Sequence, residues 1–187
     1  VVCDAGRASG RSQPDEILCL PDGRFGFKVV DPASGRRVGV FDYEDVREAA
    51  PVAVHAVIAD VLGWLAPMAQ ERGVRLTAGV EPLTVSGDAE QLREAIGNVV
   101  ANAILYNRPD GSVTVTAREC GGVAMIEIVD TGVGIPAEAV PRVFDRFFRV
   151  DKARSREIGG SGLGLSIARA ILVAHGGDIA CTSEPGT

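Results

Sequence analysis

Two asparagines, Asn98 and Asn102, stand four residues apart in a stretch whose apolar residues recur at helical spacing. Residues four apart lie on one face of a helix, so both side chains would point to the same side. A carboxamide oxygen is a neutral, hard ligand that can complete the coordination of a Mg²⁺ ion held mainly by phosphate groups. The pair is a candidate metal site, although two solvated surface asparagines are the more common explanation for such a pair alone.

A second candidate site is the segment of residues 130–136 (Asp-Thr-Gly-Val-Gly-Ile-Pro), which directly follows an apolar run typical of a strand. A carboxylate at the end of a strand, here Asp130, can accept a hydrogen bond from an exocyclic amine of a ligand. Gly132 and Gly134 would let a flat ring approach the backbone closely. Taken alone, the segment is as consistent with an ordinary turn as with a binding site.

Residues 142–157 form a basic segment, with six arginine or lysine residues against three acidic ones. Its local charge is +3 in a chain whose net charge is −6. It also contains Phe144, Phe147 and Phe148. A mobile basic segment anchored by aromatic side chains could close over a polyphosphate as a lid. A solvated charged loop is the commoner explanation for a charge run by itself.

The fourth candidate is the glycine-rich run of residues 159–165 (Gly-Gly-Ser-Gly-Leu-Gly-Leu), which leads straight into a helical pattern. Glycines leave backbone N–H groups free to point at phosphate oxygens, and the start of a helix adds partial positive charge. The run is not a P-loop, because no Gly-Lys-Ser/Thr follows, and no strand precedes it as in a dinucleotide-binding turn. As a lone glycine cluster it is a weak signal.

Hydrophobic periodicity around these motifs predicts the elements that must position them. Helices are expected at residues 52–73, from Asp88 onward and at residues 163–175, with a short helix starting at Pro136. Asp88 can cap the second helix, whose N3 residue is Gln91. The expected apolar face of that helix comprises Leu92, Ile96, Val99, Ala103 and Tyr106.

Strands are expected at residues 74–80, 83–85, 113–116, 125–129 and 179–182. A sheet covered by helices on one face is the simplest packing for this mixture. The first fifty residues differ, with apolar runs at 17–20, 25–30 and 38–41 separated by Pro/Asp/Gly/Ser turn chemistry. They predict a small β-meander, with a linker at 42–50 that ends before Pro51.

Composition narrows the class of protein. The 187 residues are 46% hydrophobic and 24% charged, as in soluble globular proteins, and the acidic balance argues against coating nucleic acid or an anionic membrane. The cysteines lack the spacing of a zinc site or a disulfide framework. The most apolar stretch, residues 49–68, is interrupted by Pro51, His55 and Asp60, which argues against a membrane span, and no signal peptide is recognised. These features predict a cytoplasmic protein, or the cytoplasmic part of a membrane sensor.

Taken together in this order, the four motifs resemble the N, G1, F and G2 boxes of the ATP-binding catalytic domain of sensor histidine kinases. That domain belongs to a superfamily shared with gyrase, Hsp90 and MutL. The resemblance covers residues 52–187 and leaves the first fifty unexplained. It implies ATP and Mg²⁺ as ligands, and an α+β two-layer sandwich of the Bergerat type with a mixed sheet covered by helices on one face. The expected domains are a β-rich appendage at 1–50 and the catalytic domain at 51–187.

The resemblance also implies roles for individual residues. Asn102 would bind Mg²⁺ with support from Asn98, Asp130 would bond the adenine amino group, and Arg149 would reach the phosphates. The implied catalytic residues are Asn98, Asn102 and Arg149. The implied nucleotide-contacting residues are Asn102, Tyr106, Asp130, Gly132, Gly134, Ile135, Phe144, Phe147, Arg149, Gly160, Gly162, Leu163, Gly164 and Leu165.

Within that superfamily, the residue four positions before the metal-binding asparagine separates hydrolysis from transfer. ATP-hydrolysing relatives carry a glutamate there as general base, whereas this chain has Asn98, which cannot take a proton. The resemblance therefore implies transfer of the γ-phosphoryl group to a histidine. Neither His55 nor His175 has the family's acceptor context, so the acceptor is expected on a dimerisation domain outside this sequence, with a response regulator downstream.

Two departures from the family leave alternatives open. Leu105 stands where the family often has a basic residue, and the sequence ends before a final strand that normally follows. The sheet is thus either trimmed or completed by another segment, for which the N-terminal meander is one candidate. A nucleotide-binding module without catalysis and a serine kinase of the anti-sigma type are the alternative functions.

Overall fold

The structure of the chain is a computed structural model that describes residues 17–19, 25–30, 37–43, 50–150 and 161–183. It divides into two compact units, Val1–Arg47 and Glu48–Thr187. In the first unit, strands β1 (Ile17–Cys19), β2 (Phe25–Val30) and β3 (Arg37–Tyr43) pair antiparallel in the order β1-β2-β3 as a sheet of their own. These strands lie at the three apolar runs that predicted them, while the expected turns and most of the expected linker fall outside the described residues.

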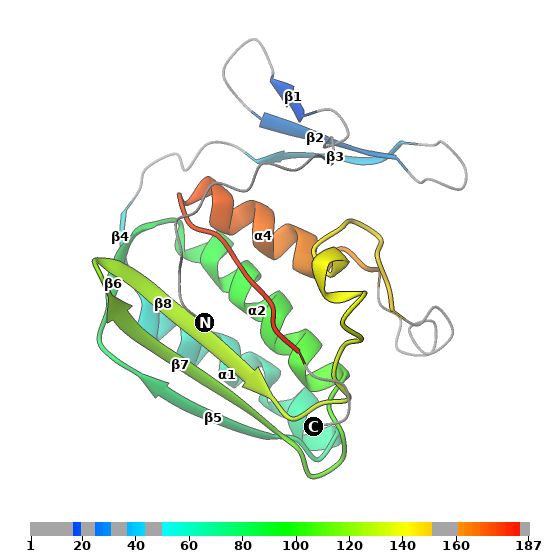
Figure 1. The fold of residues 1–187 in the computed structure, drawn as a ribbon. Coiled ribbons are helices and arrows are strands. Elements are labelled where there is room, and N and C mark those ends of the chain that lie inside the picture. The colour runs from blue at the N-terminus through cyan, green and yellow to red at the C-terminus, as the bar shows by residue number, and fades with distance from the viewer. Residues whose placement is uncertain (1–16, 20–24, 31–36, 44–49, 151–160, 184–187) are drawn as a thin grey trace. The chain divides into compact units, whose positions relative to one another are not determined.

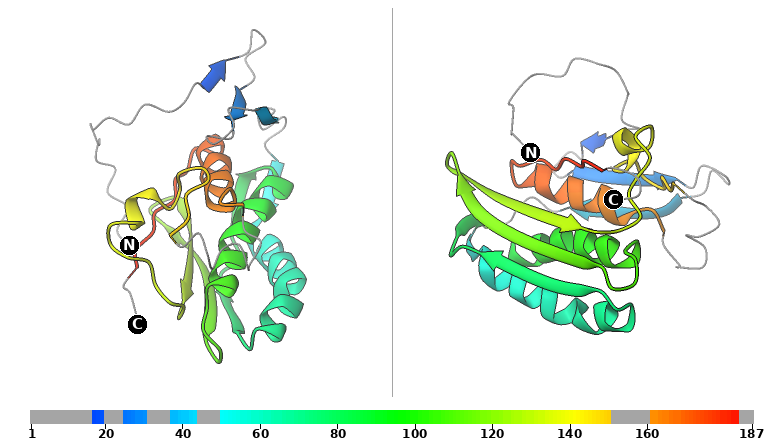
Figure 2. Two further views of the ribbon diagram at one scale, coloured as in Figure 1. Left: turned by 90° about the vertical axis from the view of Figure 1, so that its right-hand side faces the viewer. Right: turned by 60° about the horizontal axis from the view of Figure 1, so that its bottom comes forward.

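The second unit is a two-layer arrangement of a mixed sheet and helices (Figures 1 and 2). Strand β5 (Arg75–Val80) pairs parallel with β7 (Ser112–Cys120), which pairs antiparallel with β8 (Val123–Asp130). Helices α1 (Val54–Glu71) and α2 (Ala89–Leu105) pack on this sheet, and α4 (Gly164–Ala174) packs against α2. The predicted fold class is confirmed.

Helix α1 begins later than the sequence pattern predicts. Residues Ala50–Ala53 form strand β4, which pairs antiparallel with β6 (Thr84–Gly87), and the N–H of Val54 donates to the Leu83 carbonyl at 2.9 Å. The prediction of a helix from Val52 is wrong because pairing with a distant strand outweighs local periodicity. The apolar residues of α1 that pack into the core are Val54, Val57, Ile58, Val61, Leu65 and Ala69.

Helix α2 starts as its capping residue predicts. The Asp88 carboxylate accepts hydrogen bonds from the N–H groups of Glu90 at 2.9 Å and Gln91 at 3.1 Å. The predicted apolar face is only partly right, because Val99 is half-buried and Tyr106 caps the C-terminal end. Since α2 packs against α1, α4 and the sheet, its buried side is wider than one stripe. It comprises Leu92, Ala95, Ile96, Gly97, Val100, Ala103 and Ile104.

Two further elements differ from prediction. Pro136 opens hydrogen-bonded turns, in which its carbonyl accepts from the N–H of Ala139, and only a 3-10 turn, η1 (Val140–Arg142), follows instead of an α-helix. Residues 179–182 form no strand: the Ile179 N–H donates to the Asp178 carboxylate, and the Ser183 hydroxyl accepts from the N–H of Ile135. A strand requires ladder bonds to a neighbouring strand, and the Ile179 N–H bonds a side chain instead.

His175 ties the end of α4 to the start of α2. Its Nε2 accepts from the backbone N–H of Asp88 at 3.0 Å, and its Nδ1 donates to the Ile171 carbonyl at 2.8 Å. A Cβ at Gly87 would lie 2.6 Å from Cδ2 of the same ring, so only glycine fits beside it. Because both ring nitrogens are engaged, His175 has a structural role.

We expect His175→Ala to lower the free energy of unfolding by about 2 kcal/mol, because the Asp88 N–H loses its acceptor and a cavity opens beside Gly87. Urea denaturation measures the change. His55→Ala, at an exposed position on α1, serves as the control and is expected to change stability by less than about 0.5 kcal/mol. Equal stability of the two variants would contradict the structural role of His175.

Candidate functional site

The predicted site residues of helix α2 share one side of that helix. Asn98, Asn102 and Tyr106 follow one another at four-residue spacing, and all three are half-buried. The carboxamide oxygen of Asn98 lies 3.3 Å from the point where a Cβ at Gly164 would stand, so this side of α2 faces the start of α4. The absence of a side chain at Gly164 lets the two helices approach at this point.

Strand β8 delivers Asp130 to the helix-covered side of the sheet. In the β7–β8 ladder, Asp130 pairs with Val113 and Ile128 pairs with Val115, and both valines are fully buried. Directly paired residues share a face of the sheet, so Asp130 lies on the same face as the core. The alternation of the strand therefore aims this carboxylate toward α2 rather than toward the outer face.

Asp130, Gly132 and Tyr106 meet at the C-terminal end of α2. The Asp130 carboxylate accepts from the Gly132 N–H at 2.8 Å, and the Tyr106 carbonyl accepts from the Val133 N–H at 3.1 Å. A Cβ at Gly132 would lie 2.6 Å from the Asp130 carboxylate oxygen and 2.7 Å from the Tyr106 carbonyl oxygen. A side chain at position 132 would therefore collide with both groups, and the approach of a flat ring to this backbone stays a prediction.

The basic segment contacts the glycine-rich run through Phe147. Its N–H donates to the Gly162 carbonyl at 2.9 Å, and its φ of 61° is a left-handed conformation that is costly for an aromatic residue. A Cβ at Gly162 would lie 3.0 Å from the Phe147 Cα and 3.1 Å from the Phe148 carbonyl oxygen. The two motifs are thus held together by backbone contacts that only glycine permits.

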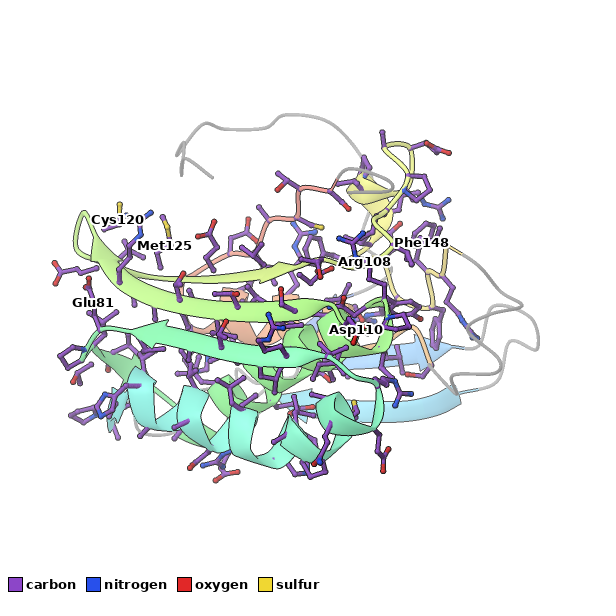
Figure 3. All side chains as sticks on the ribbon, turned by 90° about the horizontal axis from the view of Figure 1, so that it is seen from below. Glu81, Arg108, Asp110, Cys120, Met125 and Phe148 are labelled. Atoms are coloured by element: carbon purple, nitrogen blue, oxygen red, sulfur yellow. The ribbon has the colours of Figure 1, made fainter. Side chains whose placement is uncertain are left out.

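Two cation–π contacts anchor the other phenylalanines. The Arg142 guanidinium lies 4.5 Å from the centre of the Phe148 ring and also pairs with Asp145, while Arg169 of α4 lies 5.8 Å from the centre of the Phe144 ring. In Figure 3, Phe148 lies at the same end of the sheet as Arg108 and Asp110, opposite the Cys120 turn. Residues 142–150, the described part of the basic segment, therefore lie at the end of the sheet where α2 and β8 finish.

Arg149 carries the most distinctive charge of the site. Its Nε and Nη2 atoms are buried and have no hydrogen-bond partner among the described residues. Buried donors without acceptors are unfavourable, and the oxygens of an anion would supply the missing acceptors. Gly160, predicted to lie on the same phosphate path, falls outside the described residues.

The remaining predicted site residues lie in the loop after β8 and at the start of α4. Gly134 has a φ of 72°, and the Ile135 N–H donates to the Ser183 hydroxyl at 2.8 Å. Leu163 is the N-cap residue of α4 and Leu165 lies in its first turn, and both are half-buried.

Four residues that contact the site received no role from the sequence: Asn107, Thr131 (part of the 130–136 motif), Cys181 and Ser183. Burial, and then the neighbouring Asp130 carboxylate, raise the pKa of the Cys181 thiol, which places this cysteine near the candidate base-binding carboxylate. Asn107 directly follows Tyr106, so its position at the end of the helix could have indicated that it lies beside the site. Nothing local marks Cys181 or Ser183, because their contacts depend on where the chain returns after α4.

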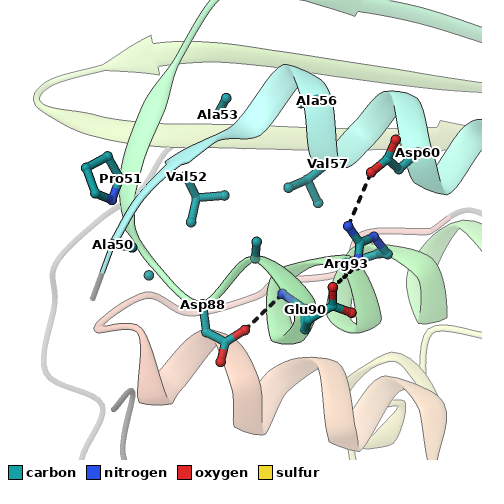
Figure 4. Close-up of a pocket in the computed structure, with 12 residues that line it drawn as sticks. Ala50, Pro51, Val52, Ala53, Ala56, Val57, Asp60, Asp88, Glu90 and Arg93 are labelled. Atoms are coloured by element: carbon teal, nitrogen blue, oxygen red, sulfur yellow. Dashed lines mark hydrogen bonds and ion pairs between the residues drawn. The ribbon is translucent and has the colours of Figure 1, made fainter. Parts of the chain in front are cut away.

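Other possible sites are separate from these motifs. Among the described residues, no group of three or more His, Cys, Asp or Glu side chains could hold a metal ion. A shallow groove of about 440 Å³ lies where β4 and β6 meet the first turns of α1 and α2, next to Arg93 and its partners Asp60 and Glu90 (Figure 4). It includes none of the predicted site residues.

In the part of the chain that is described, no helix is both long and apolar enough to cross a bilayer.

Comparison with known families agrees with this geometry. Residues 87–187, more than half of the chain, match the family described as histidine kinase-, DNA gyrase B- and HSP90-like ATPase. The chain belongs to this family of ATP-binding domains. The matched residues begin at the end of β6 and contain all four motifs.

Its relatives include sensor histidine kinases. The chain is 48% identical over 103 residues to the sensor-like histidine kinase SenX3 of Mycolicibacterium smegmatis, which covers 55% of this chain and 27% of SenX3. It is similar to the structure of the mycobacterial sensor histidine kinase MprB, with 33% identity and a TM-score of 0.61 over 68% of this chain and 80% of that one. It also resembles full-length ShkA in complex with AMPPNP, with 29% identity and a TM-score of 0.65 over 77% of this chain and 30% of that one. The predicted resemblance is confirmed.

Proposed function

We propose that this chain is the catalytic part of a sensor histidine kinase, which transfers the γ-phosphoryl group of ATP to a histidine on a dimerisation domain. The observation that carries the proposal is that two guanidinium nitrogens of the half-buried Arg149, Nε and Nη2, are buried and have no hydrogen-bond partner in the described part of the chain, close in sequence to the Phe147–Gly162 contact. A polyphosphate would supply the missing acceptors. The catalytic domain is proposed to span residues 51–187, with residues 1–50 as its appendage, and a response regulator is the proposed downstream partner.

The base end of the site suits adenine. The Asp130 carboxylate can accept from the exocyclic amino group of adenine, whereas guanine presents a carbonyl oxygen that a carboxylate repels. Gly132 leaves no side chain between the carboxylate and the Tyr106 carbonyl, so a flat ring can approach the backbone. Tyr106 and Ile135 are the proposed flanks of the base.

The phosphate end uses backbone and guanidinium donors. Gly162 and Gly164 precede or begin α4, whose first N–H groups and partial positive charge favour an anion. Arg149 adds a planar donor that suits phosphate oxygens. Leu105, which is half-buried on α2, offers no charge at a position where the family often has one, so Arg149 and the helix start carry more of the phosphate binding.

The amide oxygens of Asn98 and Asn102 fit a Mg²⁺ ion held mainly by the nucleotide. Because no cluster of three acidic, histidine or cysteine side chains stands in the described part of the chain, the protein ligands would be neutral oxygens, which suits an ion that keeps water and phosphate ligands. When bound, the ion neutralises charge on the phosphates. Phe144 and Phe147 would anchor the basic segment over this end of the site.

The proposed reaction is an in-line displacement at the γ-phosphorus. The lone pair of a histidine nitrogen on the dimerisation domain forms the new P–N bond, the bond from the γ-phosphorus to the bridging oxygen breaks, and ADP leaves with that electron pair. Asn98 cannot remove a proton from water, which favours transfer over hydrolysis. His175 is not the acceptor in this proposal, because both of its ring nitrogens are engaged.

Incubation of the chain with radiolabelled Mg-ATP and purified dimerisation hairpins from sensor histidine kinases tests the proposal. We expect acid-labile label on the hairpin, and about tenfold less transfer by Arg149→Met, with the unfolding midpoint of the nucleotide-free variant equal or higher. Arg118→Met, at an exposed position of β7, is the control. Nucleotide binding without transfer to any hairpin would favour a non-catalytic module, and a folded chain that binds no ATP would overturn the proposal.

A further inference from the structure

The side-chain amide of Asn107 joins the end of α2 to the strands beside the candidate adenine site. Its Nδ2 donates to the carbonyls of Ala103 and Ser112, both at 3.1 Å. Its Oδ1 accepts from the backbone N–H of Arg108 at 3.0 Å and from the Thr131 hydroxyl at 3.3 Å. All four hydrogen-bonding positions of this amide are therefore used.

The Thr131 hydroxyl completes the connection. It accepts from the Ser112 N–H at 2.8 Å while it donates to Asn107, and the Thr131 N–H donates to the Ser112 carbonyl at 3.1 Å. A Cβ at Gly111 would lie 2.1 Å from the Asn107 carboxamide oxygen and 2.8 Å from the Thr131 hydroxyl. The end of α2, the start of β7 and the residue after β8 thus meet at one polar cluster, formed by Asn107, Ser112 and Thr131.

This polar cluster lies directly beside the groups proposed to recognise the base. Asn107 is the neighbour of Tyr106, whose carbonyl accepts from Val133, and Thr131 is the neighbour of Asp130. The cluster therefore sets the distance between the end of α2 and the end of β8. A shift of either end would move the Asp130 carboxylate relative to the Tyr106 backbone, and recognition of a flat ring is sensitive to such shifts.

We infer that Asn107 and Thr131 are positioning residues that determine how strongly the site prefers adenine over other purines. Neither side chain needs to touch the nucleotide: Thr131 holds Asn107, and together they hold Asp130 in register with α2. The inference rests on the proposed function, because it concerns the same nucleotide site.

The test compares Thr131→Val, which removes the hydroxyl at nearly constant volume, with Thr131→Ser, which keeps it. Calorimetric titrations with ADP and with inosine diphosphate, which lacks the exocyclic amine, give the preference of each variant. We expect Thr131→Val to reduce the ratio of the two affinities by about three- to tenfold and Thr131→Ser to preserve it. A purely structural role would lower the urea midpoint without changing this ratio.

The control is Thr114→Val, which removes a threonine hydroxyl from the same sheet, where it bonds the Thr77 hydroxyl at 2.9 Å on the other face. Thr131→Ala removes the hydroxyl together with the γ-methyl and adds no group, and it replaces the valine variant if that one does not fold. An unchanged ratio in a folded variant that lacks the Thr131 hydroxyl would overturn the inference. Failure of the wild-type chain to bind ADP would instead overturn the proposed function.

Discussion

Asp130→Ala is expected to weaken binding of a non-hydrolysable ATP analogue by about 100-fold. The substitution removes a charged acceptor, and such hydrogen bonds contribute about 1.5–3 kcal/mol, which corresponds to about 10- to 150-fold in affinity. It also leaves the Gly132 N–H without its acceptor, which loosens the turn beside Tyr106. Titration calorimetry of the whole chain with and without Mg²⁺ measures the effect.

Two comparisons separate recognition from general damage. Asp130→Asn keeps the shape and one neutral acceptor, so its affinity is expected to fall between those of wild type and Asp130→Ala. Glu127→Ala removes an exposed carboxylate from the same strand, at a register position that pairs with Thr116, and is expected to leave binding unchanged. Equal affinities for wild type and Asp130→Ala would show that this carboxylate does not bind the base.

Gly162→Ala is expected to abolish phosphoryl transfer, with a loss of about 100-fold or more, and to lower the free energy of unfolding by about 3 kcal/mol. The added methyl would stand 3.0 Å from the Phe147 Cα and 3.1 Å from the Phe148 carbonyl oxygen, and neither backbone atom can rotate away. The residues that lead to Arg149 would be displaced from the glycine-rich run. Transfer assays and urea denaturation of the same preparation measure both effects.

Gly176→Ala is the matched control for this substitution. Gly176 has a φ of 74°, nearly equal to the 73° of Gly162, but a Cβ there would meet no atom within 4 Å. Gly176→Ala should lower the free energy of unfolding by about 1–2 kcal/mol, because alanine is strained in the left-handed conformation, and should leave ATP binding unchanged. If both alanine variants behaved alike, contact between the basic segment and Gly162 would not be needed for activity.

Local interactions explain the parts of the fold that could be predicted. The cap of α2 depends on Asp88 and the N–H groups two and three residues later, and the β7–β8 hairpin depends on its adjacent glycines, Gly121 at a φ of 61° and Gly122 at 82°. The wrong strand and helix predictions at residues 50–53 and 179–182 concern segments for which the presence or absence of a strand partner elsewhere in the chain decides the structure. Residues 50–53 pair with β6, whereas residues 179–182 form no strand and the Ile179 N–H bonds the Asp178 side chain.

The candidate site also has features that local sequence predicts and features that only packing decides. Helical period alone placed Asn98 and Asn102 on one side of a helix, although it assigned Tyr106 to the apolar face, and the glycine positions predicted space for a flat ring near the backbone. The four motifs in their order were sufficient to identify the family, because each motif keeps its residue types within a short segment. The sequence by itself thus determined the class of the domain and the candidate nucleotide-binding residues.

Only the tertiary structure decided which of these residues meet. Asn98 faces Gly164, Phe147 bonds Gly162, and the Thr131 hydroxyl reaches Asn107, and each contact joins segments more than ten residues apart. The burial of the Arg149 Nε and Nη2 atoms, which lack a hydrogen-bond partner among the residues that the structure describes, also follows from packing, because charge in the sequence does not reveal burial. The physical reason is that backbone propensity acts over a few residues, whereas burial and hydrogen-bond partners are set when helices and sheet pack together.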